Sequence, residues 1–114
     1  MKNRFQKNKE LLTLLSKSKR KFRNSIISNS NKEQIFSICE CVLNVCNGNI
    51  KLNDDNYQKL KPFRKTFNKL LDKKTSLKNK KKLLIQKGGF IEFLIPAVIS
   101  GIANIISAAI SKNE

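Results

Sequence analysis

The 21-residue segment Phe90–Ile110 contains only one charged residue, Glu92. A helix of this length and apolarity spans the hydrocarbon core of a bilayer. Small residues lie among its Ile and Leu side chains and would allow a second helix to approach closely. These small residues are Ala97, Ser100, Gly101, Ala103 and Asn104. The segment predicts either a helix that inserts into or disrupts a membrane, or a helix that associates with itself or with a partner in a large assembly.

The chain before this segment is strongly basic. Residues 1–30 carry nine Lys or Arg and one acid, and residues 51–88 carry thirteen and three, whereas residues 31–50 and 89–114 are each at −1. The net charge of the whole chain is +16. A solvated surface normally mixes both signs, so an excess of this size indicates a polyanionic partner. Double-stranded DNA is the expected partner, and anionic lipid is the alternative.

The type of cation indicates how DNA would be recognised. The chain has 20 Lys and only 4 Arg among its 24 cations. Lys acts as a point charge on phosphate, whereas Arg makes the bidentate contact that identifies guanine. We therefore expect binding without sequence specificity. The expected phosphate contacts are Lys17, Lys19, Arg20, Lys21, Arg23, Lys78, Lys80, Lys81 and Lys82. The few aromatic residues are helically spaced, which favours a place in the core over base stacking.

Apolar residues recur at helical spacing along the first half of the chain. The pattern predicts a helix over about Lys7–Ser28, with a point near Ser16–Ser18 where it could break. A second helix, Lys32–Asn47, is expected to start at a capping box formed by Ser30 and Glu33. This second helix carries the fewest charges and is predicted to be the centre of a small bundle.

Turn and cap residues divide the second half. Asn53 is a predicted N-cap. Pro62 is expected to kink or divide the helix in which it lies. Ser76 is a predicted cap for a helix over Leu77–Gln86 that stops or bends at Gly88-Gly89.

These elements predict an all-α protein. We expect a small basic bundle of three to four short helices over residues 5–87, followed by one long hydrophobic C-terminal helix. In functional terms, residues 1–88 form a basic helical nucleic-acid-binding region, and residues 89–114 form a hydrophobic, membrane-like tail helix.

No catalytic or metal constellation is recognisable. The chain has no His, so the commonest general base and metal ligand are missing. Cys39, Cys41 and Cys46 lack a fourth zinc ligand and are expected to be small buried apolar residues. Three thiols, and residues 1–10 without the apolar stretch of a signal peptide, predict a reducing cytosolic or nuclear setting. We therefore expect no enzyme, no cofactor and no metal.

The order of a basic part, a Gly-Gly pair and an apolar tail resembles a known viral family. Lys87-Gly88-Gly89-Phe90, followed by the run from Phe93 to Ala103, is similar to the tail of the adenovirus core protein X precursor (pre-mu). The stretch from Ser76 to Leu84 resembles related proteins of Maverick/Polinton elements and adintoviruses. The N-terminal part differs, because the adenoviral protein is rich in Arg and His and is largely unfolded.

The resemblance implies a late viral core protein that condenses DNA in the virion and in the host nucleus. Viral core or capsid proteins would be further partners, and residues 90–110 could contact a membrane. The resemblance also implies a site for a maturation protease at Gly88, Gly89 and Phe90, with cleavage after Gly89. The family's protease prefers an aliphatic residue at the position that Gln86 occupies here.

Overall fold

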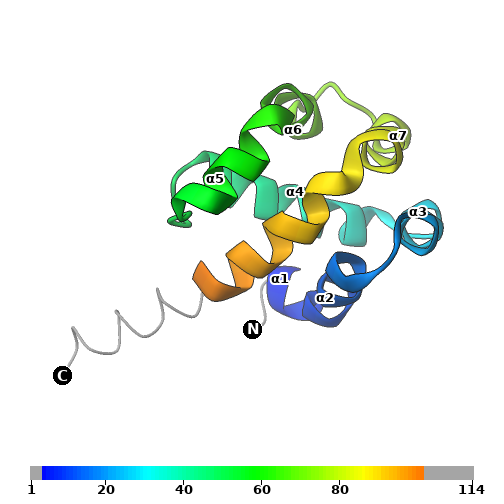
Figure 1. Ribbon diagram of the computed structural model, residues 1–114. Coiled ribbons are helices and arrows are strands. Elements are labelled where there is room, and N and C mark those ends of the chain that lie inside the picture. The colour runs from blue at the N-terminus through cyan, green and yellow to red at the C-terminus, as the bar shows by residue number, and fades with distance from the viewer. Residues whose placement is uncertain (1–3, 102–114) are drawn as a thin grey trace.

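A computed structural model describes residues 4–101 of the 114 residues (Figure 1). This part of the chain is all-α, as the sequence predicts, and contains no β-strand. The elements are α1 (Arg4–Lys7), α2 (Lys9–Lys17), α3 (Arg20–Ser28), α4 (Lys32–Cys46), α5 (Asp54–Leu60), the 3-10 turn η1 (Lys61–Phe63), α6 (Arg64–Leu71), α7 (Leu77–Lys87) and the 3-10 turn η2 (Gly88–Phe90), followed by helical residues 91–101.

The predicted break in the first helix occurs at Ser18. Its backbone leaves the helix with ψ at 145°, and its hydroxyl donates to the carbonyl oxygen of Leu14 at 2.6 Å. Lys19 is also extended, and α3 starts at Arg20. The apolar stripe over residues 7–28 therefore folds as two helices joined by a short turn, not as one rod.

The capping box of α4 lies one residue later than predicted. The Asn31 side chain accepts from the backbone N–H of Gln34, and the Gln34 side chain accepts from the backbone N–H of Asn31, both at 2.9 Å. Ser30 is not the cap because its hydroxyl donates to the carbonyl oxygen of Ile26, at the end of α3. At the other end of α4, Gly48 has φ at +74°, a conformation that glycine adopts without a steric penalty.

Caps and breaks in the second half agree with the predictions. The Asn53 side chain accepts from the backbone N–H of Asn56 and caps α5. Pro62 lies in η1, where it separates α5 from α6. The Ser76 hydroxyl accepts from the backbone N–H of Asn79 and caps α7.

Helix α4 is the centre of the bundle, as predicted. It contacts α1, α6 and α7. Its buried residues are Ile35, Ser37, Ile38, Cys39, Cys41 and Val42. These residues lie on more than one side of the helix, which is typical of a helix surrounded by others.

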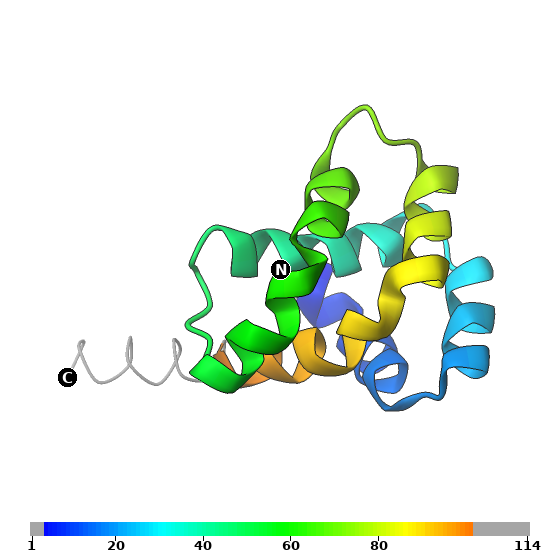
Figure 2. The ribbon, with the colours of Figure 1, turned by 45° about the horizontal axis from the view of Figure 1, so that its top comes forward.

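The described part of the predicted tail belongs to this core. Residues Leu77–Gly101 form one helical stretch whose direction changes at η2 (Figures 1 and 2). Beyond the bend, the buried side chains are Phe90, Ile91, Leu94, Ile95, Ala97 and Val98. All of these except Ala97 share one apolar cluster with residues of α2, α4, α6 and α7. The division at residue 88 therefore does not separate two independently packed units within residues 4–101.

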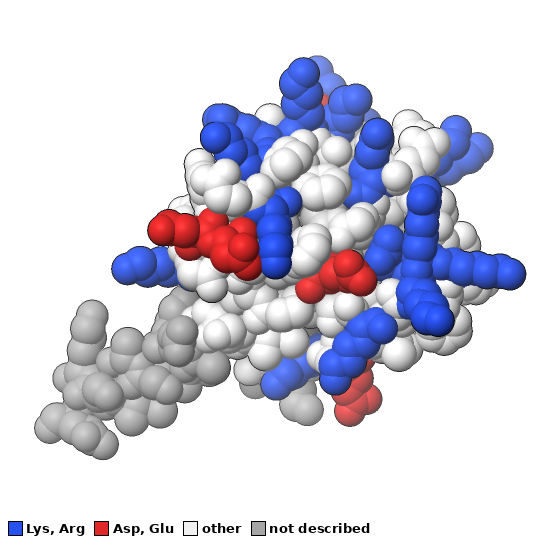
Figure 3. Space-filling model, viewed as in Figure 1, with Lys and Arg blue, Asp and Glu red and all other residues white. Residues whose placement is uncertain are grey.

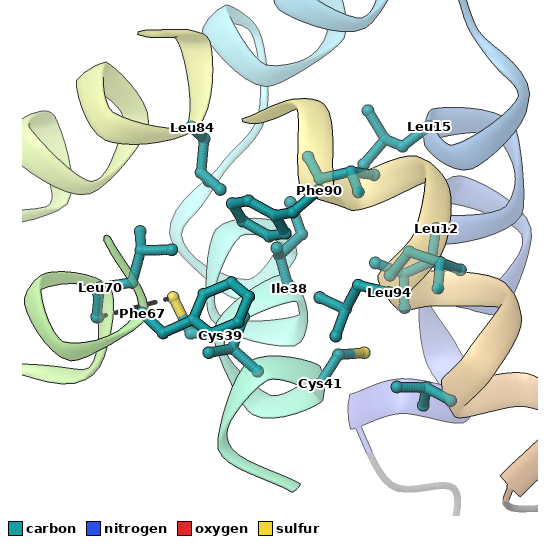
Figure 4. Close-up of a cluster of buried hydrophobic side chains, with 14 of the residues drawn as sticks. Leu12, Leu15, Ile38, Cys39, Cys41, Phe67, Leu70, Leu84, Phe90 and Leu94 are labelled. Atoms are coloured by element: carbon teal, nitrogen blue, oxygen red, sulfur yellow. Dashed lines mark hydrogen bonds between the residues drawn. The ribbon is translucent and has the colours of Figure 1, made fainter. Parts of the chain in front are cut away.

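Phe90 lies in the middle of that cluster and is fully buried (Figure 4). Its ring is 4.9 Å from the ring of Phe67, edge to face, and 5.5 Å from that of Phe63. Leu84 and Ile38 approach it from α7 and α4. Aromatic contacts of this kind stabilise a core beyond the area that they bury.

The stretch Leu77–Gly101 is also long and apolar enough to cross a membrane by length and composition. A buried core helix meets the same criteria. Of the predicted membrane segment Phe90–Ile110, residues 102–110 lie outside the described residues.

Candidate nucleic-acid interface

The two most basic parts of the sequence meet where α3 packs against α7. The Nζ of Lys81, in the first half of α7, donates to the carbonyl oxygen of Ser28, the last residue of α3, at 3.3 Å. A Cβ at Gly88, just after α7, would lie 3.8 Å from the Nε of Arg23, near the start of α3. The two helices are therefore antiparallel neighbours.

Most of the predicted phosphate contacts are accessible on this pair of helices or on the residues just before α3. Lys17, Lys19, Arg20, Lys21, Lys78 and Lys82 are exposed, and Lys81 is half-buried. We call these seven residues the α3–α7 basic surface. Figure 3 shows Lys and Arg side chains gathered over α6 and α7 at the upper edge of the molecule and over α3 at the right.

Among residues 4–101, no acidic side chain forms an ion pair with the basic surface. The two ion pairs within residues 4–101 lie elsewhere: Arg4 with Glu33, and Lys59 with Asp55, each at 3.0 Å. Because α3 and α7 both lack an acid in their first turn, the positive N-terminal ends of their dipoles add to the side-chain charge. The surface is therefore an uncompensated cationic field.

Lys80 does not belong to this surface, which corrects the prediction that it contacts phosphate. Lys80 is only 7% exposed, and its Nζ donates to the carbonyl oxygens of Leu70 and Asp72. These carbonyls are at the end of α6 and have no helical partner. The cation thus caps α6 from inside the fold.

Arg23 is also buried, at 5% exposed, so its expected phosphate contact is not on the α3–α7 basic surface and stays a prediction. It lies on the side of α3 that faces η2, where it lines a cleft with Arg20, Lys87, Gly88 and Gly89. Arg23 lies four residues before the buried Ile27 and therefore on the same face of α3. A hydrophobic pattern does not reveal this placement, because Arg23 is charged.

The predicted list omits further cations beside α7. Lys69 of α6 and Lys82 of α7 line one shallow pocket of about 270 Å³, and Lys87 lines the cleft at η2. The signal that could have identified them is the charge density of residues 61–87 as a whole, in which Lys recurs well outside the run at positions 78–82.

The predicted protease site lies inside the fold. Gly88, Gly89 and Phe90 form η2; Gly89 is exposed, but Gly88 and Phe90 are buried. Since a protease needs an extended, accessible segment, cleavage after Gly89 requires local unfolding of the bundle. Cleavage at this bond stays a prediction.

Cys39 and Cys41 occupy the core, as predicted, whereas Cys46 is exposed and the prediction that it is buried is wrong. The thiol of Cys39 donates weakly to the carbonyl oxygen of Leu70 at 3.9 Å (Figure 4). Burial, assisted by the Glu40 carboxylate, raises the pKa of the Cys41 thiol to about 12. Across residues 4–101, no cluster of three or more His, Cys, Asp or Glu side chains is arranged to hold a metal ion.

Comparison of the chain with protein-family models, curated proteins and solved structures gives no significant match.

Proposed function

We propose that the protein binds double-stranded DNA without sequence specificity and condenses it. The observation that carries this proposal is the α3–α7 basic surface, which joins two distant basic segments and has no acidic partner within the described residues. Repulsion among these cations destabilises the folded protein unless a polyanion neutralises their charge.

The proposed mechanism is charge neutralisation. Exposed Lys side chains approach the phosphates and release the counterions condensed on DNA, so the affinity falls steeply as salt rises. Six of the seven residues of the surface are Lys. Point charges of this kind hold the backbone and do not identify bases. Once their phosphate charges are neutralised, neighbouring DNA segments repel one another less and can pack closely.

The assignment to a viral core depends on the resemblance of residues 76–103 to the adenovirus core protein X precursor. In this proposal the protein is a late component of a virion core, acts in the host nucleus, and meets viral core or capsid proteins. It has no catalytic role and needs no cofactor.

A membrane-active function is the alternative, and it draws on the apolar stretch Leu77–Gly101. Insertion of this stretch would remove Phe90, Leu94 and Val98 from the core, where each is fully buried. The bilayer would bury these three side chains again, but their core partners, such as Phe67 and Leu84, would lose their apolar cover. Each partner left facing water costs up to about 1.5–3 kcal/mol, so insertion has to disrupt the bundle.

The test is titration of the full chain into two duplexes of unrelated sequence at several salt concentrations. We expect equal affinities that decrease together with salt, and light scattering from condensed DNA at charge equivalence. Failure to bind either duplex in dilute buffer would contradict the proposal, as would a strong preference for one sequence. Leakage of liposomes at the same protein concentrations would favour the membrane function.

A further inference from the structure

A small cleft lies between the first turn of α3 and the end of α7. It measures about 230 Å³ and is lined by Arg20, Arg23, Lys87, Gly88 and Gly89, among other residues. Sites for drug-sized ligands have volumes of about 300–1,000 Å³. This cleft therefore suits a small group. No acidic residue lines it, whereas three cations do.

Arg23 is the residue that most needs an anion. Its side chain is 5% exposed, its Nε has no hydrogen-bond partner, and it belongs to neither ion pair of residues 4–101. A buried guanidinium without a counter-charge is costly, because hydration is lost and, at Nε, no acceptor replaces it. An anion in the cleft would provide both the missing charge and the missing acceptor.

The backbone around the cleft also favours an anion. Helix α3 starts at Arg20 without a side-chain cap, so the N–H groups of its first turn and the positive end of its dipole are open to a ligand. Arg20 and Lys87 are both exposed and bring two further positive charges to the rim.

Gly88 and Gly89 fit close approach by a ligand. Neither has a positive φ, and a Cβ at Gly89 would contact nothing within 4 Å. At Gly88 a Cβ would make only ordinary contacts, at 3.5 and 3.8 Å. Backbone conformation and internal packing therefore do not require glycine at these positions. A bound ligand in contact with the backbone would require it, because a Cβ would occupy the same space.

We propose that this cleft binds one phosphate group of the DNA backbone, with the guanidinium of Arg23 as its buried partner and Arg20 and Lys87 at its rim. The inference deepens the proposed function and rests on it. The cleft fixes the position of one phosphate, while the exposed Lys side chains of the basic surface neutralise its neighbours.

The first experiment uses inorganic phosphate as the probe and measures the Tm of the full chain, with sodium chloride at equal ionic strength as the reference. At about ten times the Kd, phosphate should raise the Tm of a domain of this size by about 5 °C. Arg23→Met should abolish the shift and raise the Tm without phosphate, since an unpaired buried charge is removed.

Two further variants keep the test decisive. Arg64→Met removes an exposed Arg from α6 and should retain the full shift. Arg20→Met combined with Lys87→Met changes two exposed side chains that the fold does not need, and should reduce the shift even if Arg23→Met fails to fold. A shift that survives in Arg23→Met, an undiminished shift in the double variant, or no shift in the wild type would overturn the phosphate site.

A DNA titration separates this inference from the proposed function. Arg23→Met should reduce the salt slope of DNA binding by about one relative to Arg64→Met. If Arg23→Met loses the phosphate shift but keeps the slope, the cleft takes free phosphate and the assignment to DNA is wrong. Salt-dependent DNA binding without any phosphate shift would leave the proposed function standing and remove only the cleft.

Discussion

The Nζ of Lys80 on α7 donates a hydrogen bond to the main-chain carbonyl oxygen of Leu70 at the end of α6. Lys80 also donates to the carbonyl oxygen of Asp72 at 3.1 Å. Its neighbour Lys82 is exposed. Two cations that are equivalent in the sequence therefore have different roles: one completes the end of a helix, and the other is free to meet a phosphate.

Exchange of Lys80 or Lys82 for Met should separate these roles. Lys80→Met leaves the carbonyl of Leu70 without its main donor, so the free energy of unfolding should fall by about 1–3 kcal/mol. Lys82→Met should change it by less than about 0.5 kcal/mol. Urea denaturation measures both. Equal stabilities of the two variants would show that Lys80 does not cap α6.

Phe90→Ala should destabilise the whole bundle. The Phe90 ring is fully buried against Phe63 and Phe67, and removal of such a ring costs about 3–5 kcal/mol. Phe22→Ala is the matched control, because Phe22 is 55% exposed. Thermal unfolding followed by circular dichroism compares them. If the two variants melt alike, residue 90 belongs to a separate tail and not to the core.

Gly101→Ala should destabilise the packing of residues 91–101 against the turn after α4. A Cβ at Gly101 would lie only 2.5 Å from the Cγ2 of Ile50, which is buried. Overpacking of this kind costs about 1–3 kcal/mol. Gly89→Ala, where a Cβ meets nothing, should leave the Tm unchanged or raise it. A Gly101→Ala protein as stable as the wild type would contradict this contact.

Thiol reactivity should distinguish the three cysteines. Cys46 is exposed and should react with a thiol reagent in the native state. Cys41 is buried, and its pKa of about 12 leaves almost no thiolate at pH 8, so it should react only after unfolding. Cys39 is also buried, so mass spectrometry of the labelled native chain should find only Cys46 modified. Rapid labelling of Cys41 would contradict its burial.

Local features of the fold could be predicted from the sequence because they depend on a few neighbouring residues. The caps at Asn53 and Ser76 and the break at Pro62 follow from hydrogen bonds and sterics within one turn. The capping box of α4 is displaced by one residue because the Ser30 hydroxyl donates to the carbonyl oxygen of Ile26 at the end of α3, whereas the Asn31 side chain accepts from the backbone N–H of Gln34.

Burial could not be predicted from the sequence, because it depends on which helices meet. Apolarity alone does not tell a membrane helix from one that other helices surround, so the described part of Phe90–Ile110 was expected to be a tail. Likewise, the charge of Arg23 and Lys80 predicts exposure, whereas their positions on α3 and α7 turn both toward neighbouring elements. For the α3–α7 basic surface, the sequence identified the cations but not their proximity, and for the cleft it missed Lys87.

The α3–α7 basic surface is tested most directly by two variants of equal net charge. One changes Lys19, Lys21 and Lys82 to Gln, and the other changes Lys7, Lys51 and Lys61, which are exposed outside the surface. The measurement is the slope of log K for duplex DNA against log salt. The first variant should lower the slope by about three and the second by much less. Equal slopes for the two variants would contradict the account.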